Sequence, residues 1–153
     1  KPGWQSNLVE IVPLAMQTKI EVICQDPYEQ GVRAKLNFGH TIGHALELVS
    51  GFSLRHGEAV AIGMLAETKL AVEMGLAEPE IVSQVAECLA FHKLPLNIPA
   101  GLPTEAILIA MTRDKKKNAG EVKFVLPQRV GEVSFGHTVD LRLVQAVIET
   151  MKL

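Results

Sequence analysis

Residues 58–74, "EAVAIGMLAETKLAVEM", decide the fold class that the sequence predicts. The run is rich in Ala, Leu, Met and Glu, which are strong helix formers, and it ends at Gly75, a residue type that commonly terminates helices. We therefore predict a helix over this range and interpret it as the central helix of the core.

Helical patterns also occur on both sides of this run. In residues 8–22, apolar side chains recur at spacings of three and four, which is typical of a helix with one buried face. Pro13 either kinks this first helix or marks its true start. The segment 32–49 forms a second predicted helix, closed by Ser50 and Gly51. Further helices are predicted over residues 79–92, 104–111 and 141–153, the last one capped by Thr138 or Asp140.

One part of the chain alternates with a period of two, which is typical of β-strands. The stretches "EVKFVLP" (121–127) and "GEVSFG" (131–136) predict a small hairpin whose turn crosses residues 127–131. The predicted fold class is therefore mainly α, a multi-helix array with one short β-hairpin. A length of 153 residues with 48% apolar side chains suits one domain spanning residues 1–153.

Composition excludes several classes of protein. A net charge of −2 gives no general reason to expect a nucleic acid or an anionic membrane as partner. The two cysteines, Cys24 and Cys88, lie far apart and form neither a disulfide framework nor a CxxC-type metal motif. No apolar run approaches the roughly 20 residues that span a bilayer. We expect a soluble protein in a reducing, cytoplasmic setting.

Histidines are concentrated in one part of the sequence. In "RAKLNFGHTIGHALE" (33–47), His40 and His44 lie four residues apart, so one helix face would carry both rings. His56 follows in "LRHGEAVAIGM" (54–64). A single helical histidine is more often structural, but three in so short a span favour a site for a metal such as zinc. The glutamate of an HExxH motif is missing, which disfavours a metalloprotease, and no third ligand is evident.

Polar residues accompany these histidines. On one continuous helix, Arg33 and Asn37 would share a stripe with His40 and His44, and such a stripe is too polar for a dry core. It more plausibly lines a wet cleft for an anion, because arginine binds carboxylate or phosphate with two parallel hydrogen bonds.

Basic and acidic residues nearby allow two interpretations each. The segment "RDKKK" (113–117) is either a solvated surface loop or, together with Lys19, part of the anion site. Glu58 either orients the ring of His56 or simply occupies the first turn of its helix, where the dipole favours an acid. We interpret His92 and His137 as structural or surface residues.

Three motifs resemble the C-terminal domain of the 3-dehydroquinate synthases: the stretches 33–47 and 54–64, and "RDKKK" followed by "GEVKFVLP" (120–127). The resemblance covers nearly the whole chain. It implies the helical half of a two-domain α/β plus α enzyme, a phosphate-eliminating lyase of the shikimate pathway that uses NAD and a divalent metal, zinc or cobalt. The family's reaction converts 3-deoxy-D-arabino-heptulosonate 7-phosphate, a phosphorylated keto acid, into 3-dehydroquinate and phosphate.

The resemblance also implies residue roles. His40 and His56 would be metal ligands, and His44 would contact the substrate and assist proton transfer. Arg33 and Asn37 would bind the polar groups of the substrate. Lys19 would lie near the carboxylate or the hydroxyls of the substrate, and Lys115 or Lys116 would bind its phosphate. Glu29 would position these basic residues.

The family's remaining parts are not found in this sequence. Its third zinc ligand is a glutamate that lies, with the NAD-binding domain, N-terminal to the segments present here. This chain contains no Gly-rich dinucleotide fingerprint after a strand. We therefore expect the isolated chain to hold zinc weakly and to be inactive, and the complete enzyme to be a homodimer in which the N-terminal domain is the chain's partner.

Three alternatives stay open at this point. A related sugar-phosphate cyclase, or a metal-dependent alcohol or glycerol dehydrogenase, would share the histidine motifs. Arg33, Asn37 and the lysines of "DKK" favour a phosphorylated, carboxylated substrate over a neutral polyol. A helical module that has lost catalysis is the third alternative, against which the retention of all three histidines argues.

Overall fold

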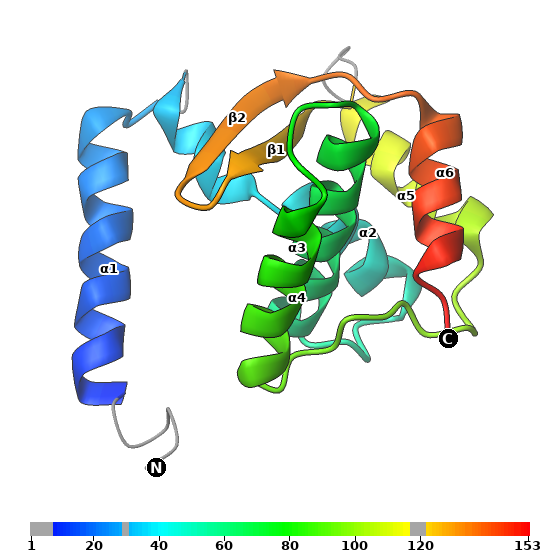
Figure 1. Ribbon diagram of the computed structural model, residues 1–153, viewed down its shortest axis with the longest axis horizontal. Helices are drawn as coiled ribbons and strands as arrows, with labels where there is room; N and C mark the ends of the chain where they lie inside the picture. The colour runs from blue at the N-terminus through cyan, green and yellow to red at the C-terminus, as the bar shows by residue number, and fades with distance from the viewer. Residues whose placement is uncertain (1–7, 29–30, 117–121) are drawn as a thin grey trace. The chain divides into compact units, whose positions relative to one another are not determined.

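The computed structural model describes residues 8–28, 31–116 and 122–153 (Figure 1). Their contacts divide the chain into two compact units, Lys1–Leu36 and Asn37–Leu153, and each unit is described by itself. The predicted fold class is confirmed, because the described residues are mostly helical and contain a two-stranded antiparallel sheet. The role of the whole chain as one C-terminal domain stays a prediction.

The first unit contains α1, Leu8–Gln25, which is three residues longer than predicted. Pro13 lies inside this helix rather than at its start. The expected buried face is wrong for the residues described here: none of α1 is buried, and Met16 is 58% exposed. After α1, the carboxylate of Asp26 accepts hydrogen bonds from the backbone N–H groups of Gly31 (2.8 Å) and Arg33 (3.0 Å).

The segment 32–49 is not the single helix that the sequence predicts. It consists of a short 3₁₀ helix, η2 (Val32–Asn37), and an α-helix, α2 (His40–Val49). Gly39 separates them with a φ of +82°, a left-handed conformation that ends one helix before the next begins. The predicted stripe of Arg33, Asn37, His40 and His44 on one helix face is therefore wrong.

The central helix is α3, His56–Glu73, which begins two residues before the predicted start and contacts α2, α4, α6 and β1. Glycines allow α2 and α3 to approach backbone to backbone. A Cβ on Gly63 would overlap the carbonyl oxygen of Gly39, and a Cβ on Gly43 would lie 3.1 Å from the Cα of Val60. The crossing of these two helices thus requires glycine on both sides.

The other helices follow the sequence patterns more closely. Helix α4 spans Glu80–Phe91, directly after Pro79, and α6 spans Leu141–Thr150. The side chain of Asp140 accepts a hydrogen bond from the N–H of Arg142 at 2.8 Å, so the predicted cap is confirmed. Helix α5, Thr104–Lys116, continues five residues past its predicted end, because no glycine or proline interrupts the chain there.

The hairpin is confirmed, with its turn displaced. Strand β1 spans Phe124–Arg129 and pairs antiparallel with β2, Glu132–His137. Pro127 lies inside β1, next to an irregularity in the register, and the turn is formed by Val130 and Gly131. In a two-stranded sheet a proline is tolerated where its missing N–H faces away from the partner strand.

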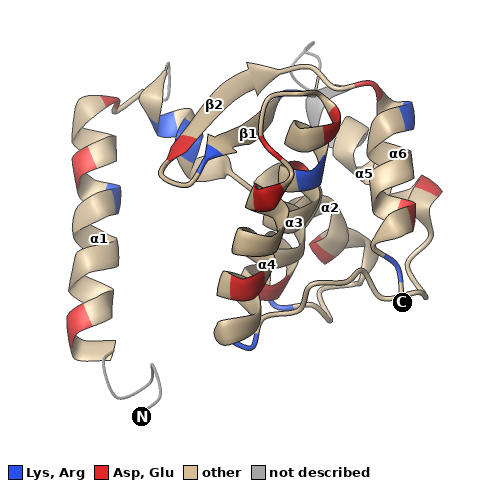
Figure 2. Ribbon diagram, viewed as in Figure 1, with Lys and Arg blue, Asp and Glu red and all other residues tan. Residues whose placement is uncertain are grey.

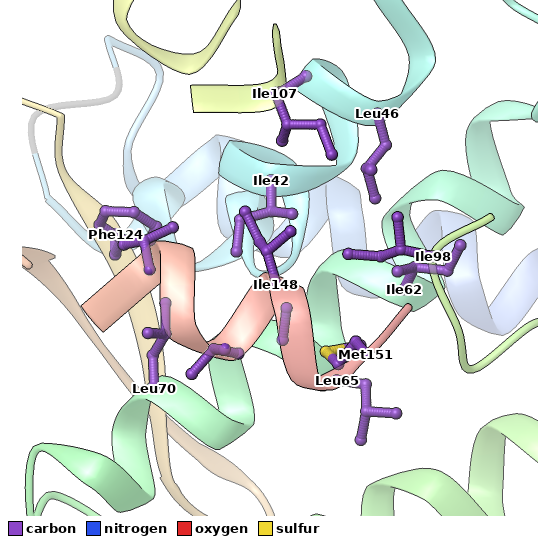
Figure 3. Packing of buried hydrophobic residues seen from close by; sticks show 14 of the residues in the cluster. Ile42, Leu46, Ile62, Leu65, Leu70, Ile98, Ile107, Phe124, Ile148 and Met151 are labelled. Carbon is purple, nitrogen blue, oxygen red and sulfur yellow. The ribbon is translucent and has the colours of Figure 1, made fainter. Parts of the chain in front are cut away.

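The core of the second unit is formed between these elements (Figure 3). Ile42 of α2, Ile62 of α3 and Ile148 of α6 are all fully buried. The remaining labelled core residues are Leu46, Leu65, Leu70, Ile98, Ile107, Phe124 and Met151. This packing holds α2 and α3 together, and the three histidines of the predicted site lie on those helices.

Charges of both signs occur together on the helices (Figure 2), as on α1, where Glu10 and Glu21 accompany Lys19. Cys24 and Cys88 are exposed, free thiols, in agreement with the absence of a disulfide framework. Among the described residues, no helix combines the length and apolarity needed to cross a bilayer.

Candidate metal centre

The structure brings the three imidazoles of the sequence motifs together. His40 is the first residue of α2, His44 lies one turn further along, and His56 is the first residue of α3. Ring centroids are 5.2 Å apart for His40 and His44, 5.4 Å for His40 and His56, and 5.9 Å for His44 and His56. Three rings at these distances can converge on one small ligand.

The proton of His40 is placed by a backbone acceptor. Its Nδ1 lies 3.2 Å from the carbonyl oxygen of Phe38, and because a carbonyl can only accept, Nδ1 carries the proton. The lone pair is then on Nε2. Burial lowers the pKa of His40 below its usual 6.5, and the nearby His44 and His56 act in the same direction. His40 is thus kept as a neutral imidazole, the form that binds metals.

The proton of His56 is placed by a carboxylate. Its Nδ1 lies 3.0 Å from Oε2 of Glu47, which is near the end of α2 and whose side chain is only 16% exposed. A carboxylate also accepts, so His56 directs Nε2 away from Glu47. A histidine held this way by a carboxylate is typical of metal ligands, because the second partner fixes the tautomer and ring orientation.

Sequence reasoning missed Glu47 and considered Glu58 in its place. The carboxylate of Glu58 instead accepts the backbone N–H of Arg55 at 2.9 Å and caps α3, which agrees with the simpler of its two interpretations. The available signal was the spacing of Glu47 from His44: three residues on a helix place both side chains on one face.

The donor atoms suit a divalent cation. Ligand atoms of His44, Glu47 and His56 all lie within 4.8 Å of one another. This group contains the predicted ligand His56 but not His40, whose ring centroid lies 5.2 Å from that of His44 and 5.4 Å from that of His56. Imidazole nitrogens are donors that zinc and cobalt accept, and the carboxylate of Glu47 orients one of these rings through its contact with Nδ1 of His56. His44 and His56 are exposed, so this group of donors is open to solvent and to further ligands.

Of the predicted substrate residues near the N-terminus, Lys19 and Arg33 belong to the first unit. Lys19 lies in α1 and Arg33 in η2, where Nη1 of Arg33 donates to the carbonyl oxygen of Pro27 at 2.8 Å. Asn37, the last residue of η2, begins the second unit. Glu29 lies outside the described residues. The association of these residues with the histidines stays a prediction.

The predicted phosphate lysines lie on a helix rather than in a loop. Lys115 and Lys116 occupy the last turn of α5, where the negative end of the helix dipole favours cations. Their side chains lie outside the described part of the structure, so their role also stays a prediction. His92 forms the C-cap of α4, and His137 contacts Oγ of Ser134 at 2.7 Å within β2.

The fold and the site together define a class: a helical domain in which two helices crossing at glycines present three imidazoles at a candidate metal centre. Comparison with known proteins then identifies the family. Residues 4–117 match the family described as 3-dehydroquinate synthase C-terminal, and the chain belongs to that family.

Individual relatives agree with this assignment. The chain is 40% identical over 144 residues to the 3-dehydroquinate synthase of Crocosphaera subtropica, and 42% identical over 142 residues to that of Nostoc punctiforme. These matches cover 94% and 92% of this chain but only 40% and 39% of the relatives. The chain therefore spans about two fifths of the length of the curated relatives it matches.

Solved structures of related cyclases have a similar fold. A 2-deoxy-scyllo-inosose synthase complexed with carbaglucose-6-phosphate, NAD⁺ and Co²⁺ matches with a TM-score of 0.82 and 26% identity, over 95% of this chain and 41% of that one. A 2-epi-5-epi-valiolone synthase from Streptomyces hygroscopicus, with NAD⁺ and Zn²⁺ bound, matches with a TM-score of 0.79 over 94% of this chain and 39% of that one. At 24% identity, the second match concerns the fold alone.

Proposed function

We propose that this chain is the metal- and substrate-binding domain of a 3-dehydroquinate synthase. With an N-terminal NAD-binding domain it would convert 3-deoxy-D-arabino-heptulosonate 7-phosphate into 3-dehydroquinate and phosphate, as a lyase. The observation that carries the proposal is the convergence of His40, His44 and His56 from two helices, with Nδ1 of both His40 and His56 occupied by internal acceptors.

In this proposal His40 and His56 hold the divalent metal through Nε2. The carbonyl of Phe38 and the carboxylate of Glu47 fix the orientation of the two rings. The chemistry supplied by a bound metal is polarisation of a substrate hydroxyl, and that supplied by NAD⁺ is the temporary removal of a hydride. A further ligand would come from the N-terminal domain.

His44 would move a proton. It lies one helical turn beyond His40, with the two rings in an edge-to-face arrangement, and it is exposed. A neutral imidazole can accept a proton and return it near neutral pH, which suits a reaction that abstracts a proton and later restores one.

Basic and polar side chains would bind the substrate's charged groups. Arg33 and Asn37 would bind its polar groups, since a guanidinium can hold a carboxylate with two parallel hydrogen bonds. Three residues complete this proposed set: Lys19 near the carboxylate or hydroxyls, and Lys115 or Lys116 at the phosphate. Glu29 would position these basic side chains. Holding one flexible substrate in a reactive conformation is a major part of such catalysis.

A second candidate is a related sugar-phosphate cyclase. It is favoured by the likeness to the 2-deoxy-scyllo-inosose synthase, whose bound ligand is a phosphorylated carbasugar. That enzyme class would use the same imidazoles on another phosphorylated substrate. The relatives at 40–42% identity are 3-dehydroquinate synthases, which makes that activity the stronger candidate. We also expect the complete enzyme to be a cytoplasmic homodimer, and the isolated chain to be inactive.

The test uses the enzyme that combines this chain with its NAD-binding domain. Supplied with the heptulosonate phosphate, NAD⁺ and zinc, it should release phosphate without accumulating NADH, because the hydride is returned in each turnover. If the enzyme released phosphate faster from a hexose phosphate than from the heptulosonate phosphate, it would be assigned to another class of sugar-phosphate cyclase. Accumulation of NADH from simple polyols would indicate a dehydrogenase, and no turnover with any of these substrates would indicate a non-catalytic module.

A further inference from the structure

Helix α2 begins at a residue that cannot cap it. The first N–H groups of any helix lack partners within the helix, and an N-cap Ser, Thr, Asp or Asn usually accepts one of them. The N-cap residue of α2 is Gly39, which has no side chain. Any acceptor that the protein provides for the amides that precede and follow His40 must therefore come from another residue.

Glu67, from the middle of α3, supplies that acceptor. Its Oε2 lies 2.7 Å from the backbone nitrogen of Gly39, and its Oε1 lies 3.5 Å from that of Ile42. One carboxyl group thus contacts the cap position and the third residue of α2, in place of a local capping side chain.

The glycine contact between the helices makes this reach possible. Gly63 lies one turn before Glu67 on α3, and it is in backbone contact with Gly39 and Gly43 of α2. Larger residues there would separate the helices and withdraw the carboxyl group from the amides. The hydrogen bond from Gly39 to Glu67 therefore depends on the glycine at position 63.

Glu67 is fully buried, which is costly for an acid unless hydrogen bonds compensate. Burial raises its pKa to about 8, while the N–H groups of Gly39, Ile42 and Thr41 act in the opposite direction. A leucine could pack in the core at this position without that cost. We therefore attribute the presence of a glutamate to its hydrogen bonds with the backbone amides at the start of α2.

The contact continues to the metal centre through one peptide group. The N–H of Gly39 and the carbonyl of Phe38 belong to the same peptide, which is planar and rigid. Glu67 accepts from its N–H, and its carbonyl accepts from Nδ1 of His40 at 3.2 Å. The position of the carboxyl group thereby determines where this carbonyl points and how it holds the ring.

We propose that Glu67 is a positioning residue for His40, acting through the Phe38–Gly39 peptide group and the first turn of α2. It touches neither metal nor substrate in this role. The positioning of His40 by Glu67 does not depend on the function proposed above. Only the expected effect of Glu67 on metal binding rests on that function.

The test compares variants of Glu67 in the enzyme containing both domains. Glu67→Gln keeps the shape and one acceptor, and Glu67→Leu removes both acceptors. Thr68→Val is the matched control, because Thr68 is an equally buried polar residue on α3 whose hydroxyl donates only to Met64 of its own helix, at 2.7 Å. Three readouts are used: hydrogen exchange of backbone amides at the start of α2 and the NMR signal of the His40 imidazole, both in metal-free protein, and the affinity and visible spectrum of bound Co²⁺.

For Glu67→Leu we expect exchange at Gly39 and Ile42 to accelerate at least about 10-fold, since the acceptor of their hydrogen bonds is lost. The Co²⁺ affinity should fall about 10-fold or more with an altered spectrum, as for other outer partners of metal-binding histidines. Glu67→Gln should restore part of each effect, and Thr68→Val should leave both unchanged.

Unchanged exchange and an unchanged imidazole signal of His40 in Glu67→Leu would overturn the proposal. If that variant does not fold, Glu67→Gln decides: it must alter the exchange of Gly39 and Ile42 and the signal of His40, and wild-type values there would overturn the proposal. A wild-type protein that binds no Co²⁺ would contradict the proposed function instead, while the exchange data would still judge the role of Glu67.

Discussion

The carboxylate of Glu47 and Nδ1 of His56 lie 3.0 Å apart, joining the last turn of α2 to the first residue of α3. This contact joins two helices, whereas Nδ1 of His40 contacts the backbone carbonyl of Phe38, which directly precedes α2. Two of the three imidazoles are thus oriented by different kinds of acceptor, one a carboxylate and the other a carbonyl.

Replacing Glu47 should weaken the metal centre. In Glu47→Gln the amide holds Nδ1 of His56 less strongly, so we expect the zinc affinity to fall about 10- to 100-fold. Competition with a chelator measures this. Glu58→Gln is the control, because Glu58 caps α3 and should leave zinc affinity within about 2-fold of wild type. Equal losses in both variants would argue against the assigned role of Glu47.

His40 should titrate below its ordinary value. Burial, together with the neighbouring His44 and His56, disfavours the charged ring, so in zinc-free protein its pKa should lie below 6.5. Below pH 6.5 the folded protein then holds fewer protons on His40 than the unfolded chain does. The free energy of unfolding should therefore decrease as the pH falls from 6.5 through the pKa of His40 in the folded protein. NMR titration of the ring resonances measures the midpoint, and a value of 6.5 or above would be incompatible with this environment.

The glycine crossing should not tolerate a methyl group. In Gly63→Ala the new Cβ would overlap the backbone of Gly39, which cannot move aside as a flexible side chain would. We expect the free energy of unfolding to fall by about 3 kcal/mol. Gly57→Ala, on the same helix with nothing within 4 Å of the added atom, should change it by no more than about 1 kcal/mol. Denaturant titration compares the two, and similar values would show that the helices do not cross at Gly63.

Stability should depend on the ionisation of Glu67. Its pKa is about 8 in the folded protein against an ordinary 4.5, so between these values the folded state holds a proton that the unfolded chain has released. The contribution of Glu67 to the free energy of unfolding should therefore fall as the pH rises from about 5 to 8, by at most about 1.4 kcal/mol per pH unit. The difference between wild type and Glu67→Gln isolates this contribution, and a difference that stays constant over that range would refute the shift.

Local sequence patterns predicted the elements that depend on local physics. Helix α3 was identified by its strong helix formers and α6 by Asp140, because propensity and capping act within a few residues. The error at residues 32–49 has a tertiary origin. The apolar pattern continues through Gly39, but in the structure this residue has a φ of +82° and lies against the backbone of Gly63, a contact between helices that a local pattern does not contain.

The same distinction applies to the site. The three histidines could be predicted because they lie in two compact motifs, whereas Glu47 and Glu67 resemble ordinary helix glutamates in sequence. Their roles depend on contacts between α2 and α3, over 9 residues for Glu47 and 28 for Glu67. Helix periodicity alone contains no information about which partner helix such a side chain meets.

The most direct test of the central claim is the zinc affinity of single histidine variants in the two-domain enzyme, measured together with phosphate release. In His40→Ala and His56→Ala the zinc affinity should fall by more than the roughly 100-fold effect of removing an outer partner of a metal-binding histidine. In His44→Ala the zinc affinity should be kept, and phosphate release should be lost. His92→Ala, at the C-cap of α4, should change neither. Loss of zinc in His44→Ala with zinc retained in His40→Ala would contradict the assignment of the metal centre.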